Sequence, residues 1–436
     1  MLLLKSGWVV CPSSNLNEKL DILIDDQGKI SALAPQLEVD GAEVFNAEGL
    51  TVVPGLIDLH THLREPGGEA QETIKTGTRA AAAGGYTTVA CMGNTNPKLD
   101  NPLVIRYLQQ RIKEDALVNV FIYGCITKGQ EGKELTEMAS LLAEGVVGFS
   151  DDGRSVASNA VMRRAMLYGR QFDALFSLHC EDEEICKGGA ANDGYAATVL
   201  GIPGMPAIGE ELIVARDLLL AEETGVRVHI AHLSTAGSVR LVREAKKRGV
   251  RVTAEVCPHH ICLTEDAIMG YNTMAKVNPP LRTQADIDSI IAGLQDGTID
   301  AIATDHAPHT SIDKAKDFVH APFGISGLET AFSLAYTALV KTNCLTLPAL
   351  ITKMSLNPAK ILGLKNKGRI ALGADGDLTL IDLNKETIIN PDNFESKGKN
   401  SPFAGKSVVG FPVVTIVGGK IIMKYDSTLD QRQFYK

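Results

Sequence analysis

The chain has 436 residues, of which 44% are hydrophobic and 22% charged, a balance typical of a globular protein with a sizeable core. Lys and Arg number 43 against 52 Asp and Glu, so the formal net charge is −9. This acidic balance, without a basic stripe, argues against nucleic acid or an anionic membrane as a partner. For an anionic substrate, a metal ion or a well-placed arginine must supply positive charge locally.

No segment indicates secretion or membrane insertion. The opening MLLLKSGWVV has an apolar run too short for a signal-peptide core. Elsewhere, no stretch approaches the roughly 18 apolar residues of a membrane span. The eight cysteines are scattered without a CxxC pair, which favours reduced thiols over a disulfide framework. We expect a cytoplasmic protein with a small-molecule substrate.

The two ends of the chain predict short strands and turns. In residues 1–55 the runs are GWVVCP, DILIDDQGKISALA and LTVVPG, and in residues 365–436 they are GRIALGADGDLTLIDL and VVTIVGGKIIMK. Neither segment alone has enough strands to bury a face. We therefore expect residues 1–55 plus 365–436 to form one small β-domain, and residues 56–364 to form a larger domain.

Within residues 56–364, short β-branched runs alternate with stretches of helical periodicity such as PLVIRYLQQRIKE and GSVRLVREAKKRG. Strands alternating with helices over about 250 residues are the pattern of a (β/α)8 TIM-type barrel. A doubly wound open sheet is the alternative, but it does not explain why polar residues recur at so many strand ends. The expected strands cover residues 56–61, 87–93, 118–126, 146–152, 174–181, 227–234, 251–260 and 301–308.

The first candidate strand carries Asp58, His60 and His62 at alternate positions. Side chains alternate across a strand, so these three face the same side. Two imidazoles that share a face can both reach one metal ion. The HxH pattern is short, however, and by itself it is as compatible with two hydrogen-bonded histidines in a polar strand end.

Other candidates lie at the ends of later strands: Asp151 and Asp152, His179, His232 and Asp305. Active sites of barrels assemble at the carboxyl ends of their strands. Imidazole and carboxylate ligands suit zinc and similar ions. One metal centre explains all these residues together, whereas a purely structural role must explain each of them separately.

Three other histidine-containing features are weaker candidates. His229 and His232 are an odd number apart, so on one extended strand only one can line the barrel, and His232 is nearer the end. The run Cys257–Cys262 (CPHHIC) places all its donors in one short segment, so we interpret it as a strand end and loop with packed thiols rather than a zinc site. His320 has no companion feature and is expected to be solvated.

The run Asp58-Leu-His60-Thr-His62-Leu-Arg64-Glu-Pro66, followed by Asp305-His-Ala-Pro-His309 and Lys314, resembles dihydroorotases of the amidohydrolase superfamily. The resemblance covers essentially the whole chain. It includes VVPGLIDLHTH, GNTNP at 93–97 and GRIALGADGDLTLIDL. HxH with a late Asp is common to the superfamily, while HLR together with DHAPH is much narrower.

The resemblance implies one or two zinc ions per subunit, with two favoured. It implies that His60, His62 and Asp305 bind one metal, that His179 and His232 bind a second, and that Asp152 bridges them. In hydantoinases and many dihydroorotases the bridge is a carboxylated lysine, but GVVGFSDDGRSV contains no Lys. This favours the subgroup with a bridging Asp. Asp151 is the competing bridge, since adjacent strand residues face opposite ways.

The implied reaction is the reversible hydrolysis of L-dihydroorotate to N-carbamoyl-L-aspartate in pyrimidine (UMP) synthesis, with Asp305 as general acid and base. Arg64, Asn94 and His309 are candidates for the substrate carboxylate, and Asn278 and the backbone at Phe323-Gly324 for the ring amide. The full substrate-binding set implied is His62, Arg64, Asn94, Asn278, His309, Phe323 and Gly324. The polar segment 310–321 is either a lid over the site or an ordinary solvated loop.

Two rival functions remain open from the sequence. The first is a hydantoinase or allantoinase, against which the missing lysine and the HLR and DHAPH runs argue. The second is a non-catalytic, dihydroorotase-like scaffold for aspartate transcarbamoylase, which should have lost metal ligands that this chain retains. A homodimer and an association with aspartate transcarbamoylase are compatible with an active enzyme.

Overall fold

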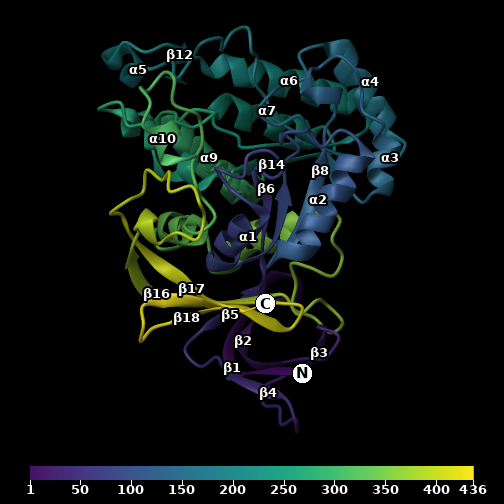
Figure 1. Ribbon diagram of the computed structural model, residues 1–436, viewed down its shortest axis with the longest axis vertical. Helices are drawn as coiled ribbons and strands as arrows, with labels where there is room; N and C mark the ends of the chain where they lie inside the picture. The colour runs from purple at the N-terminus through teal and green to yellow at the C-terminus, as the bar shows by residue number, and fades with distance from the viewer. Residues whose placement is uncertain (436) are drawn as a thin grey trace.

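A computed structural model describes residues 1–435 of the chain. Figure 1 shows a barrel of strands surrounded by helices, and beneath it a sheet that combines the first and the last segments of the chain. Both termini lie in this lower part. Among the helices of the described residues, none is long and apolar enough to cross a membrane.

The barrel contains one parallel sheet, in the order β15-β14-β13-β10-β9-β8-β7-β6. A parallel bridge between Thr61 and His306, and a hydrogen bond of 2.9 Å from His62 N to His306 O, join its first and last edges. The predicted (β/α)8 barrel is therefore confirmed. Its strands are β6 (Leu56–Thr61), β7 (Tyr86–Cys91), β8 (Asn119–Gly124), β9 (Gly148–Phe149), β10 (Leu175–Leu178), β13 (Arg227–Ile230), β14 (Val252–Val256) and β15 (Ala301–Ile302).

The helices that surround the barrel begin and end at residues with clear capping chemistry. Asn101 accepts hydrogen bonds from the second and third amides of one helix, and Thr283 begins another with a reciprocal capping box. The apolar faces of these helices cover the strands, so β6 and β7 are buried along their whole length. The longer helices are α1 (Ile74–Ala83), α2 (Pro102–Asp115), α4 (Asn159–Arg170), α6 (Ala207–Thr224), α7 (Ala236–Lys247) and α9 (Gln284–Asp296).

Shorter elements fill the connections and cover the barrel mouth. The short helices are α3 (Met138–Ala143), α5 (Tyr195–Leu200), α8 (Pro258–Cys262), α10 (Ser311–Lys314), α11 (Ala331–Ala335), α12 (Leu347–Ile351) and α13 (Asn357–Ile361). Two short strands, β11 (Ala191–Asn192) and β12 (Gly204–Met205), pair with each other in the connection after β10.

The terminal sheet is continuous across both ends of the chain, in the order β19-β18-β17-β16-β5-β1-β2-β3, with β4 paired to β1. Its apolar face forms a core separate from that of the barrel, with Leu4, Ile22, Val52, Leu380 and Ile416 all buried. The domain bounds 1–55 plus 365–436 and 56–364 stay a prediction. The strands are β1 (Leu2–Cys11), β2 (Leu16–Ile24), β3 (Ile30–Ala34), β4 (Glu43–Asn46), β5 (Thr51–Pro54), β16 (Leu378–Ile388), β17 (Ser407–Val417), β18 (Lys420–Asp426) and β19 (Gln431–Phe434).

Several barrel strands are shorter than the sequence predicts. The predicted strand 146–152 contains only Gly148–Phe149, and the predicted strand 301–308 contains only Ala301–Ile302. His232 and Asp305 have positive φ angles of 33° and 46°, which end the extended conformation before these residues are reached. His232 and Asp305 therefore lie on turns that follow the strands.

Candidate active site

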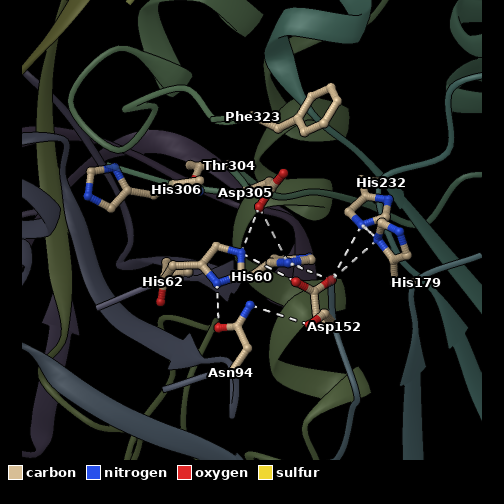
Figure 2. Close-up of polar contacts among 12 residues, drawn as sticks. His60, His62, Asn94, Asp152, His179, His232, Thr304, Asp305, His306 and Phe323 are labelled. Carbon is tan, nitrogen blue, oxygen red and sulfur yellow. Dashed lines mark hydrogen bonds and ion pairs between the residues drawn. The ribbon is translucent and has the colours of Figure 1, made fainter. Parts of the chain in front are cut away.

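The two histidines of the HxH motif point into the mouth of the barrel (Figure 2). His60 lies on β6, and His62 is the first residue after this strand. Their side chains are 0% and 5% exposed, respectively. His60 Nε2 lies 3.2 Å from Asp152 Oδ1, and His62 Nε2 lies 3.0 Å from Asp305 Oδ1. The motif thus brings two imidazoles to two carboxylates that come from distant parts of the sequence.

Asp152 lies at the centre of the group. Its Oδ1 is 3.4 Å from His232 Nε2 and 3.8 Å from His179 Nδ1, and those two ring nitrogens are 3.0 Å apart. Asp151 faces elsewhere, because its carboxylate accepts hydrogen bonds from the backbone amide and the hydroxyl of Thr127. Of the two candidate bridges, the structure places Asp152 among the histidines.

The ring nitrogens that face away from the centre also have partners. His60 Nδ1 lies 2.9 Å from Glu255 Oε1, and His62 Nδ1 lies 3.0 Å from Asn94 Oδ1. The Asn94 amide in turn donates to the carbonyl of Asp152 at 3.3 Å. Such contacts fix which ring nitrogen presents its lone pair to the centre.

The donor set fits a divalent ion. The ligand atoms of His60, His62 and Asp305 all lie within 4.8 Å of one another, as do those of His60, Asp152 and His232. Within residues 1–435, His60 Nε2 and Asp152 Oδ1 are buried and lack a hydrogen-bond partner. Burial alone would raise the pKa of Asp152, but the charge of His60 and the nearby ring of His232 hold that pKa well below its usual range. A buried, ionised carboxylate between imidazoles matches the ligands that zinc prefers.

The CPHHIC run differs partly from its prediction. It forms helix α8 rather than a loop, because Pro258 occupies the first turn, where proline is favoured. The ligand atoms of Cys257, His259 and His260 lie within 4.8 Å of one another. Burial lowers the pKa of His260 to about 4, and its Nε2 lies 2.9 Å from the carbonyl of Pro279. The absence of metal there stays a prediction, whereas His320 is 76% exposed, as expected.

Two of the three candidates for the substrate carboxylate, Arg64 and His309, lie together, whereas Asn94 contacts His62 and Asp152. Arg64 Nε donates to Pro308 O at 3.4 Å, and its Nη2 lies 3.4 Å from His309 Nε2. Burial, Arg64 and Lys314 lower the pKa of His309 to about 3, so this imidazole is neutral. His309 Nε2 also lies 2.7 Å from the carbonyl of Phe323. A guanidinium beside a neutral imidazole can accept an anion.

The candidate groups for the ring amide already have partners within the protein. The Asn278 amide donates to Glu181 Oε2 at 2.7 Å. Gly324 N donates to Lys276 O at 2.9 Å, and Gly324 O accepts from Asn400 Nδ2 at 2.9 Å. The backbone polar groups of Gly324 are therefore occupied in this conformation, which was not evident from the sequence.

The reasoning that excluded His229 from the barrel interior was wrong. Strand β13 ends at Ile230, so the alternation rule does not extend to His232. His229 Nε2 lies 3.0 Å from Glu255 Oε2, on the same carboxylate that contacts His60. Both histidines therefore face inward, His232 at the mouth and His229 deeper. Sequence reasoning also missed Glu255 itself, although a charged residue within the otherwise uncharged strand β14 (VTAEV) offered a signal.

The segment 310–321 is anchored through buried side chains. Lys314 is 1% exposed, and its Nζ donates to the carbonyls of Thr273, Lys276 and Pro322. Phe318 is 3% exposed, while Ile312 is 78% exposed. An ordinary solvated loop would not bury a lysine and a phenylalanine, so this part of the prediction is corrected.

The parallel barrel, with buried histidines and aspartates at the ends of several strands, defines a hydrolase of the amidohydrolase class. A family model described as "Amidohydrolase family" matches residues 213–423, and one described as "Dihydro-orotase-like" matches residues 49–238. The L-hydantoinase (dihydropyrimidinase) of Arthrobacter aurescens has a similar structure, with a TM-score of 0.88, 26% identity, and coverage of 97% of this chain and 95% of the other.

Relatives with curated names show which family within the amidohydrolase class the chain belongs to. A dihydroorotase of Pelotomaculum thermopropionicum is 53% identical over 97% of this chain and 98% of its own length. A dihydroorotase of Acetivibrio thermocellus is 48% identical over 97% of this chain and 99% of its own. The chain belongs to the dihydroorotase family.

Proposed function

We propose that this chain catalyses the reversible hydrolysis of L-dihydroorotate to N-carbamoyl-L-aspartate in pyrimidine synthesis. One observation carries the proposal: imidazoles and carboxylates from separate strand ends converge around Asp152, in a chain 53% identical to a dihydroorotase over nearly its whole length. The retention of this whole set argues against a scaffold that has lost catalysis.

Six residues would hold the metal in this proposal. His60, His62 and Asp305 form one group, His179 and His232 a second, and Asp152 lies between them. Zinc is the expected ion, and two ions are favoured over one. When bound, such an ion lowers the pKa of a water and polarises the carbonyl under attack. The residues must keep their lone pairs free for it, which the outer contacts of His60 and His62 achieve.

Asp305 would move the proton. In ring opening, water adds oxygen to the amide carbon, the carbon–nitrogen bond breaks, and the ring nitrogen gains a proton. Asp305 would take that proton from the attacking water and deliver it to the nitrogen, and ring closure would run in reverse. Burial alone would raise the pKa of Asp305, but the charge of His60 and a hydrogen bond with His62 keep it low, so the carboxylate starts as a base.

Arg64 would bind the carboxylate of the substrate. Among the described residues, the hydrogen-bond contacts of its guanidinium are long, 3.4 Å to Pro308 O and to His309 Nε2, which leaves donors for a bidentate pair with an anion. His309 is neutral and does not repel the guanidinium; its ring proton lies on Nε2, facing Phe323 O at 2.7 Å, so it would reach the carboxylate only by leaving that contact. Asn94 supports this side through His62, and the remaining proposed contacts to the ring are Asn278, Phe323 and Gly324.

The reaction is tested with Asp305→Asn and Arg64→Ala. Asp305→Asn should lower kcat in both directions by at least about 100-fold, since a positioned general base contributes 10²–10⁴. Near-normal turnover by this variant would remove Asp305 from proton transfer. Arg64→Ala should raise KM for dihydroorotate much more than for a neutral cyclic imide, and an equal rise for both would refute the carboxylate role.

Substrate class and metal are tested on the unaltered protein. Turnover should be greatest on L-dihydroorotate, and a preference for hydantoin or allantoin would favour the rival cyclic amidase. That comparison matters because proteins of similar structure include a hydantoinase. Metal analysis should find one or two zinc ions per subunit, and a chelator should abolish turnover until zinc is restored. Full activity in protein free of metal would refute the proposed centre.

The proposal also covers the cellular location of the protein and its protein partners. We expect a cytoplasmic enzyme, and a homodimer or an association with aspartate transcarbamoylase is compatible with a working active site. Size-exclusion chromatography with light scattering, with and without the transcarbamoylase, would measure both. The domain bounds 1–55 plus 365–436 and 56–364 are part of the same proposal.

A further inference from the structure

A row of polar side chains continues from the candidate metal centre into the barrel interior. His60 Nδ1 lies 2.9 Å from Glu255 Oε1, and His229 Nε2 lies 3.0 Å from Glu255 Oε2. His229 Nδ1 in turn lies 2.8 Å from Thr253 Oγ1. Glu255 is 0% exposed, and so are the side chains of both histidines.

These polar side chains occupy the interior of the barrel, where apolar side chains usually pack. Barrel interiors are filled mainly by Val, Ile and Leu. A buried carboxylate strongly destabilises the folded state unless it is paired and hydrogen-bonded. Glu255 is fully paired, with one histidine on each oxygen, but a branched apolar residue would avoid the cost altogether. The arrangement therefore calls for a role beyond filling space.

The contacts determine the orientation of His60. A metal-bound imidazole keeps one ring proton, and because an ionised carboxylate can only accept hydrogen bonds, that proton lies on Nδ1, facing Glu255. The lone pair of Nε2 then faces Asp152 Oδ1 at 3.2 Å and Asp305 Oδ1 at 3.5 Å. A metal ion between these atoms would bind that lone pair; without one, a proton on Nε2 would take its place.

We propose that Glu255, clamped by His229, is a positioning residue that fixes the tautomer and ring orientation of His60 for metal binding. This inference rests on the proposed metal centre. His229 acts on the oxygen of Glu255 that His60 does not contact, so the carboxylate cannot rotate away from His60. His229 is itself held by Thr253, its partner across the β13–β14 pair, whose hydroxyl contacts His229 Nδ1.

A second buried pair in the same barrel provides the matched control. His306 Nε2 lies 3.3 Å from Glu72 Oε2, and these side chains are 1% and 0% exposed. The side chain of His306 points away from the cluster around Asp152 (Figure 2). Glu72→Gln therefore removes a buried carboxylate from a histidine without touching a proposed ligand.

The test compares metal affinity and not only activity. Zn²⁺ affinity is measured by competition with a chromophoric chelator, and the ligand field by the visible spectrum of the Co²⁺ form, for wild type, Glu255→Gln, His229→Gln, the double variant and Glu72→Gln. Glu255→Gln should weaken binding by about 10- to 100-fold, the usual cost of losing such an outer contact. His229→Gln should weaken it less and should add nothing in the double variant, because it acts through Glu255. Glu72→Gln should bind like wild type.

The outcomes separate this inference from the proposed function. Wild-type protein that binds no divalent ion refutes the metal centre itself. Tight binding by wild type and by Glu255→Gln alike, with the same Co²⁺ spectrum, overturns the positioning role alone. If Glu255→Gln does not fold, His229→Gln decides, because it keeps the carboxylate. Unchanged affinity and spectrum in that variant overturn the clamp, and equal losses in Glu72→Gln reduce the effect to general destabilisation.

Discussion

Replacing Lys314 by Met should release the segment 310–321, which follows His309 directly. The buried ammonium group of Lys314 donates to Thr273 O at 3.0 Å, to Lys276 O at 3.1 Å and to Pro322 O at 2.9 Å. These three carbonyls belong to chain segments on either side of residues 310–321. Methionine has a similar volume but no donor, so it removes the anchor while leaving the space filled.

The expected cost follows from the bonds that are lost. The carbonyls of Thr273 and Lys276 each keep a backbone donor, Lys276 N at 3.1 Å and Gly324 N at 2.9 Å. The substitution removes three hydrogen bonds donated by a charged group, but two of the three carbonyls keep another donor. We therefore expect the anchored form to lose about 2–4 kcal/mol of stability relative to the released form. This lowers the ratio of anchored to released segment by about 30- to 1,000-fold.

Limited proteolysis and steady-state kinetics measure the release. In Lys314→Met, cleavage within 310–324 should accelerate, and KM for L-dihydroorotate should rise by more than kcat falls, because His309 and Gly324 flank the segment. Metal content should not change. Lys316→Met is the control, since Lys316 is 51% exposed and, within residues 1–435, forms an ion pair with Asp313 alone, at 3.1 Å. If the two variants have the same cleavage rate and the same KM, the anchoring role is refuted.

Two further predictions concern stability. Asp58→Ala removes a buried carboxylate that accepts hydrogen bonds from the amide and the hydroxyl of Thr304, at 3.0 and 2.5 Å. The free energy of unfolding, measured with urea, should fall by about 2–5 kcal/mol. An unchanged unfolding midpoint would contradict this prediction. Burial raises the pKa of Asp217 to about 6 from 3.8, although Arg216 opposes the shift. The folded state therefore holds a proton that the unfolded chain releases between about pH 4 and pH 6, and the free energy of unfolding should fall by about 3 kcal/mol as the pH rises through that window. Asp217→Asn should lack this fall, and parallel curves for both proteins would refute the assignment.

The barrel could be predicted because its signals are local and repeated. Helices such as Pro102–Asp115 and Ala236–Lys247 begin and end within a few residues of their predicted bounds, since capping residues and apolar spacing determine both. Strand lengths were predicted less well. The turns at His232 and Asp305 depend on backbone conformations with positive φ that non-glycine residues seldom adopt and that their sequence does not announce.

In the candidate site, too, features with a local signal could be predicted and contacts between distant residues could not. Residues at the mouth of the barrel could be found because the ends of parallel strands meet at one edge. The outer contacts could not, because Glu255 and His60 are 195 residues apart and no local pattern links them. His229 was excluded by a rule that holds only along a continuous strand, and β13 is too short for it. The occupied backbone groups of Gly324 likewise depend on Lys276 and Asn400, which are distant in sequence.

The pairing of β5 with β16 has a consequence during synthesis of the chain. Pro54 pairs with Leu378, so one edge of the amino-terminal strands has no partner until more than 300 further residues have been made. At ribosomal rates of 5–20 residues per second, that delay is about 15–65 s. Throughout this time an open strand edge is available to neighbouring nascent chains, which makes it a place where chaperones would act. A circular permutant that begins near residue 365 would make the two edges consecutive and shorten the exposure.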